Sequence, residues 1–167
     1  TKGHIEFRRC LAPDCTIDAA ADTQLEIPFK GEMDLGKLEE VFRKYPREKI
    51  PCAVLTVTNN TAGGQPVSMR NIRETAALCR RYGIPLLLDS ARCAENAYFI
   101  KTREEGYADK TIKEIVHEMY TYADIMTISA KKDGVVNMGG FLAMRSEELF
   151  RRAMQFNIMF EGYITYG

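Results

Sequence analysis

The chain has 167 residues, of which 23 are Lys or Arg and 23 are Asp or Glu, so its formal net charge is zero. This balance gives no overall attraction to nucleic acid or to an anionic membrane, and we expect neither as a partner. The 46% hydrophobic and 28% charged content is ordinary for a globular protein and excludes a disordered, collagen-like or wholly coiled-coil chain. No apolar run of the sequence approaches the ~18 residues of a membrane span.

The five cysteines form no Cys-x-x-Cys pair, and His4 and His117 lie far apart in the sequence. Neither a structural zinc site nor a disulfide framework is expected from this pattern. No basic and then apolar leader opens the chain, so we expect a reducing, cytoplasmic location. Because the chain begins at Thr1 without Met and ends on an aromatic run, we also expect it to be a fragment of a longer protein.

Short elements are predicted in the first third of the chain. Ile5 and Phe7 alternate with charged residues, which predicts a short strand, and residues 25–27 predict a second alternating piece. Asp34 is predicted to cap a helix that Pro46 ends.

Apolar runs and helix caps then alternate through the rest of the chain. The predicted strands are 53–58, 84–89, 124–129 and 140–144, and the first three have the apolar character of buried strands. The predicted N-caps of the later helices are Ser68, Thr111 and Ser146. Residues 98–109 are expected to be irregular or partly helical. Helices between apolar strands predict right-handed crossovers, and therefore one α/β domain with a mostly parallel sheet and flanking helices.

Polar and charged side chains follow three successive predicted strands, at the edge where open parallel sheets bind their ligands. In chain order they are Asn60, Asp89, Arg92, Ser129, Lys131 and Lys132. Singly, these residues have plain interpretations, since an aspartate at a strand end also binds magnesium, caps a helix or faces water, and a lysine pair is usually solvated. Together they indicate a site.

This combination has the chemistry of a pyridoxal-phosphate site. A lysine that forms a Schiff base must be held at a fixed point and partly desolvated, and a second ammonium beside it favours the neutral amine by like-charge repulsion. A carboxylate at the same site keeps a pyridine nitrogen protonated, which makes the ring an electron sink. Ser129 stands three residues before Lys132, where its hydroxyl could donate to a phosphate. The Rossmann, P-loop and nucleophile-elbow motifs are absent from the sequence.

Three stretches of the sequence, 60–68, 89–100 and 129–140, resemble the β-eliminating lyases, the family of tryptophanase and tyrosine phenol-lyase. The resemblance runs through nearly the whole chain. It implies that residues 1–167 are the large, pyridoxal-phosphate-binding domain of the aspartate-aminotransferase fold (fold type I). It also implies that this domain is incomplete here, lacking an N-terminal segment and the C-terminal small domain.

The same resemblance implies a role for each candidate residue. Lys132 would bond covalently to the cofactor and Asp89 would hold its pyridinium nitrogen. Arg92 and Asn60 would contact its phenolic oxygen, and Ser129 would contact its phosphate. Lys131 would tune Lys132 or order a water, with plain solvent exposure as the alternative. The backbone carbonyl of Asn137 would bind a monovalent cation, usually potassium.

The implied reaction is β-elimination of an aromatic L-amino acid, giving indole from tryptophan or phenol from tyrosine, together with pyruvate and ammonium. The implied assembly is a homo-oligomer, a dimer or tetramer. Another fold type I enzyme, either an aminotransferase or a cysteine desulfhydrase-like lyase, is an alternative, and so is a truncated fragment without catalytic activity. Because the groups that recognise the leaving ring lie largely outside this chain, the choice between tryptophan and tyrosine stays open.

Overall fold

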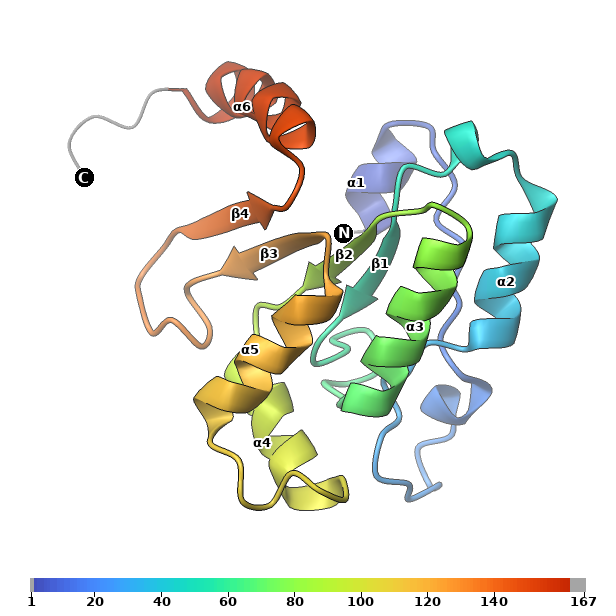
Figure 1. Ribbon diagram of the computed structural model, residues 1–167, viewed down its shortest axis with the longest axis vertical. Helices are drawn as coiled ribbons and strands as arrows, with labels where there is room; N and C mark the ends of the chain where they lie inside the picture. The colour runs from blue at the N-terminus through green and yellow to red at the C-terminus, as the bar shows by residue number, and fades with distance from the viewer. Residues whose placement is uncertain (1, 163–167) are drawn as a thin grey trace.

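A computed structural model describes residues 2–162 of the chain. Its elements are α1 (Lys2–Phe7), η1 (Asp18–Ala21), α2 (Leu35–Lys44), η2 (Arg47–Lys49), β1 (Ala53–Thr56), α3 (Met69–Arg81), β2 (Leu86–Asp89), α4 (Cys93–Arg103), α5 (Ile112–Tyr122), β3 (Ile125–Ser129), β4 (Gly140–Met144) and α6 (Glu147–Glu161). Figure 1 shows the strands side by side, with α2 and α6 at opposite ends of the molecule.

The four strands form one sheet in the order β1-β2-β3-β4. β1, β2 and β3 run parallel to one another, and β4 is antiparallel to β3. The connection between β3 and β4 contains no helix, and such a direct return makes neighbouring strands antiparallel. The expected mostly parallel α/β sheet with flanking helices is therefore confirmed.

The helices begin where side chains can take up the unpaired backbone N–H groups of the first turn. Asp34 accepts from the N–H of Lys37 at the start of α2. Ser68 and Ser146 cap α3 and α6 in the same way. Thr111 and Glu114 form a reciprocal capping box at α5. All four predicted N-caps are confirmed, and α4 covers the first part of the segment expected to be irregular or partly helical.

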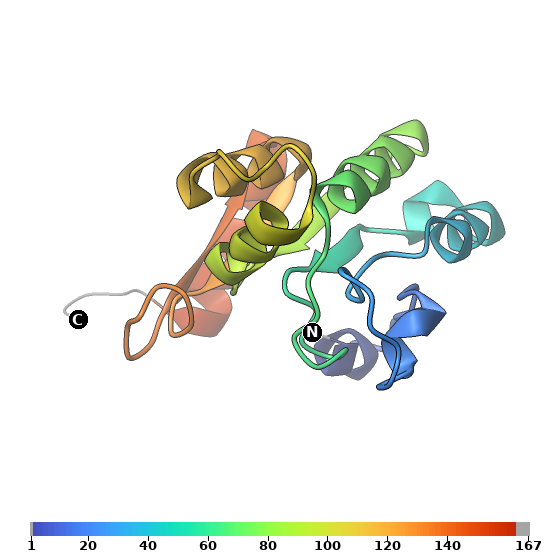
Figure 2. The same cartoon turned by 90° about the horizontal axis from the view of Figure 1, so that it is seen from below.

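The core lies between the sheet and the helices that connect its strands. In Figure 2, α3 and α5 lie above the strands and α1 lies below them. The side chains that are completely buried in this layer include Ile72, Leu86, Leu88, Ile100, Ile115 and Met119, each with 0% exposure. This apolar layer holds the strands in place against the helices, and the candidate residues lie at or beyond the carboxyl ends of these strands.

Two predictions of short strands are wrong. Residues 5–7 belong to helix α1, in which Lys2 and Glu6 form an exposed ion pair one turn apart. Residues 25–27 lie in the irregular segment between η1 and α2 and join no sheet. Alternation over so few residues fits either the helical or the strand period, so it does not decide between the two.

The far end of the sheet is less covered than predicted. Every residue of β3 is half-buried rather than buried, and Phe141 and Leu142 of β4 are exposed. In α6, exposed apolar side chains include Phe156, Met159 and Phe160. The apolar side chains between residues 156 and 160 are therefore exposed. Within residues 2–162, every helix is too short or too polar to span a bilayer.

Candidate active site

The carboxyl ends of β1, β2 and β3 meet at one edge of the sheet. The strand register places Thr56, Asp89 and Thr127 in one row. Beyond this row the chain leaves the sheet in three loops, residues 57–68 after β1, residues 90–92 after β2 and residues 130–139 after β3. All six candidate residues named from the sequence lie at this edge, at a strand end or in the loops that follow.

The first loop is a compact turn built on Asn59. The N–H of Asn59 donates to the carbonyl of Gln65 over 2.7 Å, and the N–H of Gly64 donates back to the carbonyl of Asn59 over 2.9 Å. Gly63 and Gly64 have φ of +80° and +79°, a conformation that other residues rarely adopt. The turn leaves Asn60 exposed at its outer end.

The second loop follows Asp89, which is half-buried at the end of β2. Ser90 behind it is fully buried, and its hydroxyl donates to the carbonyl of Thr127 over 2.9 Å. The hydroxyl of Tyr120 donates to the Ser90 oxygen over 3.1 Å. Burial, and then contact with Cys93, raises the pKa of Tyr120, so this phenol stays protonated and remains a donor. The turn after Asp89 is thus tied to both β3 and α5.

Arg92 connects the second loop to the first. One guanidinium nitrogen, Nη1, donates to Oδ1 of Asn60 over 2.6 Å, and Nε lies 3.7 Å from a carboxylate oxygen of Glu95. Two of the candidate residues, Asn60 and Arg92, are therefore in direct contact although 32 positions separate them.

The third loop contains the lysine pair. Lys132 is half-buried, and Lys131 beside it is exposed. The N–H of Lys132 donates to the carbonyl of Ser129 over 3.3 Å, and the carbonyl of Lys132 accepts from the N–H of Val135 over 3.0 Å. These bonds make a tight turn directly after β3.

Asp133 joins this turn to helix α4. Its carboxylate accepts from the N–H of Ala94, the second residue of α4, over 2.6 Å. Its own N–H lies 3.5 Å from the carbonyl of Ala91, to which it donates. The turn that carries Lys132 is thereby held against the loop that carries Arg92.

The two remaining candidates, Ser129 and Asn137, lie at the end of β3 and in the loop that follows it. Ser129 ends β3 opposite Gly140 of β4, and Asn137 is exposed in the loop between these strands. Residues 2–162 contain no group of three or more His, Cys, Asp or Glu side chains that could hold a metal ion. All five cysteines are free thiols.

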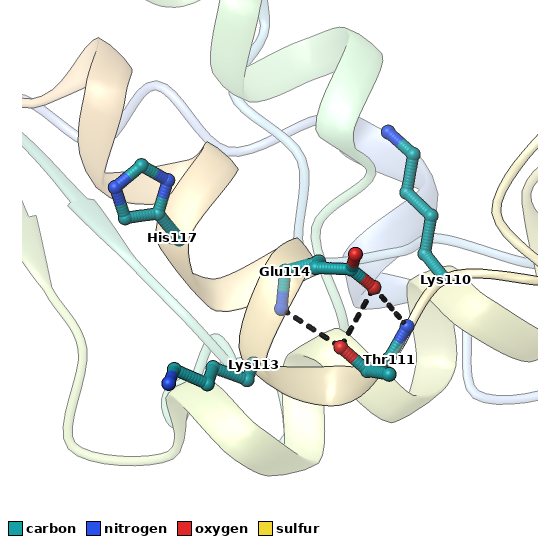
Figure 3. A pocket seen from close by; sticks show the side chains of 5 residues that line it. All are labelled: Lys110, Thr111, Lys113, Glu114 and His117. Atoms are coloured by element: carbon teal, nitrogen blue, oxygen red, sulfur yellow. Dashed lines mark hydrogen bonds between the residues drawn. The ribbon is translucent and has the colours of Figure 1, made fainter.

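Two open hollows lie elsewhere on the described surface. One, of about 620 Å³, is lined by Lys110, Thr111, Lys113, Glu114 and His117 at the start of α5. Figure 3 shows that its hydrogen bonds are those of the Thr111–Glu114 capping box, while the two lysines and His117 point apart. The other, of about 650 Å³, is lined by Thr23, Leu25, Glu26, Ile27, Pro28, Lys30, Gln65 and Arg103. Neither includes a candidate catalytic residue.

Sequence reasoning missed three residues of this edge that hold the loops in place, namely Ser90, Tyr120 and Asp133. Ser90 and Asp133 lie inside the motifs at 89–100 and 129–140, so their positions beside Asp89 and Lys132 were a usable signal. Tyr120 carries no such signal, because its contact with Ser90 spans 30 positions of the chain.

Comparisons with known proteins show which family the chain resembles. The family described as "Beta-eliminating lyase" matches residues 1–166. A probable beta-eliminating lyase of Trichomonas vaginalis is 61% identical over the whole chain, which covers 36% of that protein. A tyrosine phenol-lyase of Pasteurella multocida is 48% identical and a tryptophanase of Salinibacter ruber is 50% identical, again over the whole chain and over 36% and 35% of those proteins.

The fold has solved counterparts. The crystal structure of a putative aromatic amino acid beta-eliminating lyase/threonine aldolase from Exiguobacterium sp. 255-15 superposes with a TM-score of 0.54 at 25% identity, over 75% of this chain and 31% of that one. The sheet and helices are thus those of a fold type I large domain, in part. The chain spans about a third of the length of the curated relatives, 36% of the first of them. From the match over residues 1–166 and these identities, the chain belongs to the β-eliminating lyase family.

Proposed function

We propose that this protein catalyses the pyridoxal-phosphate-dependent β-elimination of an aromatic L-amino acid, releasing indole from tryptophan or phenol from tyrosine. The observation that supports the proposal is that the three loops after β1, β2 and β3 follow the same edge of the sheet in a β-eliminating lyase chain, and that they carry a guanidinium–amide pair, an acid and a half-buried lysine. Relatives named for either substrate are similarly close, at 48% and 50% identity, so both substrates stay within the proposal.

The donor set at this edge fits pyridoxal phosphate. A half-buried carboxylate such as Asp89 suits a protonated pyridine nitrogen, because partial desolvation strengthens the charge-assisted hydrogen bond. The half-buried Lys132 provides an amine that is partly withdrawn from water. Asn60 and Arg92 already share a hydrogen bond, so amide and guanidinium donors are available together for an anionic phenolic oxygen.

When bound, the cofactor supplies an electron sink for the pair left behind as the substrate loses its α-proton. The chain's own groups have distinct tasks in that reaction. Asp89 keeps a proton on the pyridine nitrogen, and Arg92 with Asn60 stabilises negative charge on the phenolic oxygen. Lys132 would hold the cofactor through its side-chain amine, and this amine, when free, would accept the α-proton of the substrate. Lys131 orders a water or tunes that amine, and Ser129 donates to the phosphate.

The wider assignments of the proposal rest mainly on family resemblance. Residues 1–167 would form the pyridoxal-phosphate-binding large domain, and turnover would need segments beyond them. The backbone carbonyl of Asn137 would bind potassium. The exposed apolar side chains of β4 and α6 favour a homo-oligomer, because a large exposed apolar surface usually marks an interface. The five free thiols favour a cytoplasmic location.

The test is product analysis with tryptophan, tyrosine and cysteine, using the native protein saturated with pyridoxal phosphate. We expect indole or phenol in equal amount to pyruvate, and none from Lys132→Ala. Lys113→Ala, which changes an exposed lysine of α5, is the matched control and should keep full activity. Amino transfer to a keto acid, or pyruvate from cysteine alone, would overturn the proposed reaction. An unchanged cofactor absorption spectrum in Lys132→Ala would overturn the site.

The domain assignment is tested separately. Residues 1–167 expressed alone should release indole or phenol at a small fraction of the native rate, because this segment supplies only part of the groups that position cofactor and substrate. Turnover by this segment at the native rate would contradict the assignment.

A further inference from the structure

Two side chains join the three loops of the carboxyl edge. Arg92 joins the first loop to the second through Asn60. Asp133 joins the third loop to the second through the backbone of Ala94 and Ala91. Arg92 is already assigned to cofactor binding, whereas Asp133 has no task in the proposed reaction.

The contact of Asp133 takes the place of a missing helix cap. Arg92 stands at the N-cap position of α4, with φ of −124° and ψ of 45°, and its side chain makes no capping bond. The N–H of Cys93 donates to the carbonyl of Ser90 over 3.1 Å, but the N–H of Ala94 needs an acceptor from elsewhere. Asp133 supplies it through a hydrogen bond of 2.6 Å, from a loop 39 positions further along the chain.

The same contact fixes the position of Lys132. Consecutive Cα atoms are about 3.8 Å apart, so a residue held against α4 also holds its neighbour. The other end of the turn is fixed by the bond between the N–H of Lys132 and the carbonyl of Ser129 at the end of β3. Lys132 thus stands between two anchors, the sheet on one side and the start of α4 on the other.

We propose that Asp133 is a positioning residue for the lysine, holding the backbone of Lys132 against the start of α4 and so at the correct distance from Asp89 and Arg92. This inference rests on the proposed function, because it concerns the same site. Displacing a reacting group by about 1 Å can cost ~10²-fold in rate, so the loss of this anchor should be visible in the chemistry of Lys132.

The test compares Asp133→Ala with Asp133→Asn in the native protein. Asparagine is as good a helix cap as aspartate and keeps an acceptor oxygen in place, whereas alanine removes it. Thr111→Ala is the matched control, because it removes the side-chain cap of α5, away from the lysine loop, and so carries a comparable loss of helix capping. The probe is pyridoxal phosphate.

Two measurements report on Lys132 without turnover. The first is the amount of cofactor fixed to Lys132 by borohydride reduction, located by peptide mapping. The second is the dissociation constant of the cofactor from an absorbance titration. We expect Asp133→Ala to weaken cofactor binding tenfold or more and to lower the labelling of Lys132 in parallel. Asp133→Asn should stay within about threefold of the native protein, and Thr111→Ala should be indistinguishable from it.

The outcomes separate the two proposals. If the native protein carries no label on Lys132, the assignment of the site fails before any variant is compared. If the native protein is labelled there and Asp133→Ala is labelled equally well, the site stands and the role of Asp133 is refuted. A loss in Asp133→Asn as large as in Asp133→Ala also refutes positioning, since it would show that the negative charge matters rather than the hydrogen bond.

Discussion

The buried side chain of Asn96 connects helix α4 to the segment before α3, and its contribution to stability can be tested directly. It has 0% exposure in the first half of α4, and its amide group pairs with the backbone of Val67, which is also fully buried. Oδ1 accepts from the N–H of Val67 and Nδ2 donates to the carbonyl of Val67, each over 2.9 Å. One side chain therefore satisfies both backbone groups of a residue just before α3.

Replacing Asn96 with alanine leaves both of these backbone groups buried without a partner. Each unsatisfied group costs roughly 1–3 kcal/mol, which gives about 2–6 kcal/mol for the pair. Alanine recovers only about 0.5–0.7 kcal/mol through its higher helix propensity. We therefore expect Asn96→Ala to lower the free energy of unfolding by about 1.3–5.5 kcal/mol, a substantial share of the ~5–15 kcal/mol that stabilises a typical domain.

The assay is urea unfolding followed by circular dichroism, together with hydrogen exchange of the segment that contains Val67. The unfolding midpoint should fall, and the Val67 amide should exchange much faster. Thr102→Ala is the control on the same helix, because Thr102 is exposed and bonds only to carbonyls of its own helix; it should change stability by less than about 0.5 kcal/mol. A loss below about 1 kcal/mol in Asn96→Ala with unchanged exchange at Val67 would refute the reasoning, because it would show that both groups find new partners.

Three further predictions concern the lysine turn, acid stability and thiol reactivity. A Cβ on Gly134 would lie 2.5 Å from the carbonyl oxygen four residues earlier, so Gly134→Ala should cost about 1–3 kcal/mol in urea unfolding and weaken cofactor binding. The backbone N–H and hydroxyl of Thr111 lower the pKa of Glu114, so this contribution to stability is present at neutral pH and is lost as the pH falls below the usual glutamate range; Glu114→Gln, which removes the titrating carboxyl group, should flatten the stability profile there. Burial raises the pKa of the Cys79 thiol to about 12, so at pH 8 a thiol reagent should label the exposed Cys10 and spare Cys79 until the protein unfolds.

The elements that were predicted correctly are those whose signals are local. An N-cap such as Asp34 or Thr111 acts within three residues of itself, so the sequence contains the whole interaction. The apolar runs around Leu55 and Leu88 predicted the strands β1 and β2 correctly, although every second residue of these strands is half-buried rather than buried. The segment 5–7 failed because its alternation is too short to choose between helix and strand.

The direction of β4 is an instructive intermediate case. A parallel return to the same sheet needs a crossover of a dozen or more residues, usually with a helix. Residues 130–139 are fewer than that and carry no helical pattern, so the antiparallel pairing of β4 with β3 was within reach of sequence reasoning.

For the candidate site too, some features could be predicted from the sequence and others could not. The groups placed directly at strand ends could be predicted, because the topology alone brings the carboxyl ends of parallel strands together. The bonds that set their positions could not, because each joins residues far apart in the chain: 32 positions for Arg92 and Asn60, and 39 for Asp133 and Ala94. Nothing local distinguishes an aspartate that caps a distant helix from one that faces water.

Helix α4 takes part in several of these long-range contacts. Its contacts with the start of α3 and with the loops help to explain how the carboxyl edge keeps a definite shape. Its buried side is fixed to the start of α3 by Asn96 and Val67. Its first turn is fixed to the lysine loop by Asp133. Arg92, the residue just before the helix, contacts Asn60 of the first loop. The sheet fixes where the strands end, and this helix adds contacts to the first and third loops that help to set their relative placement. A change that loosens α4 should therefore disturb the amine, the guanidinium and the amide together, even when it touches none of them.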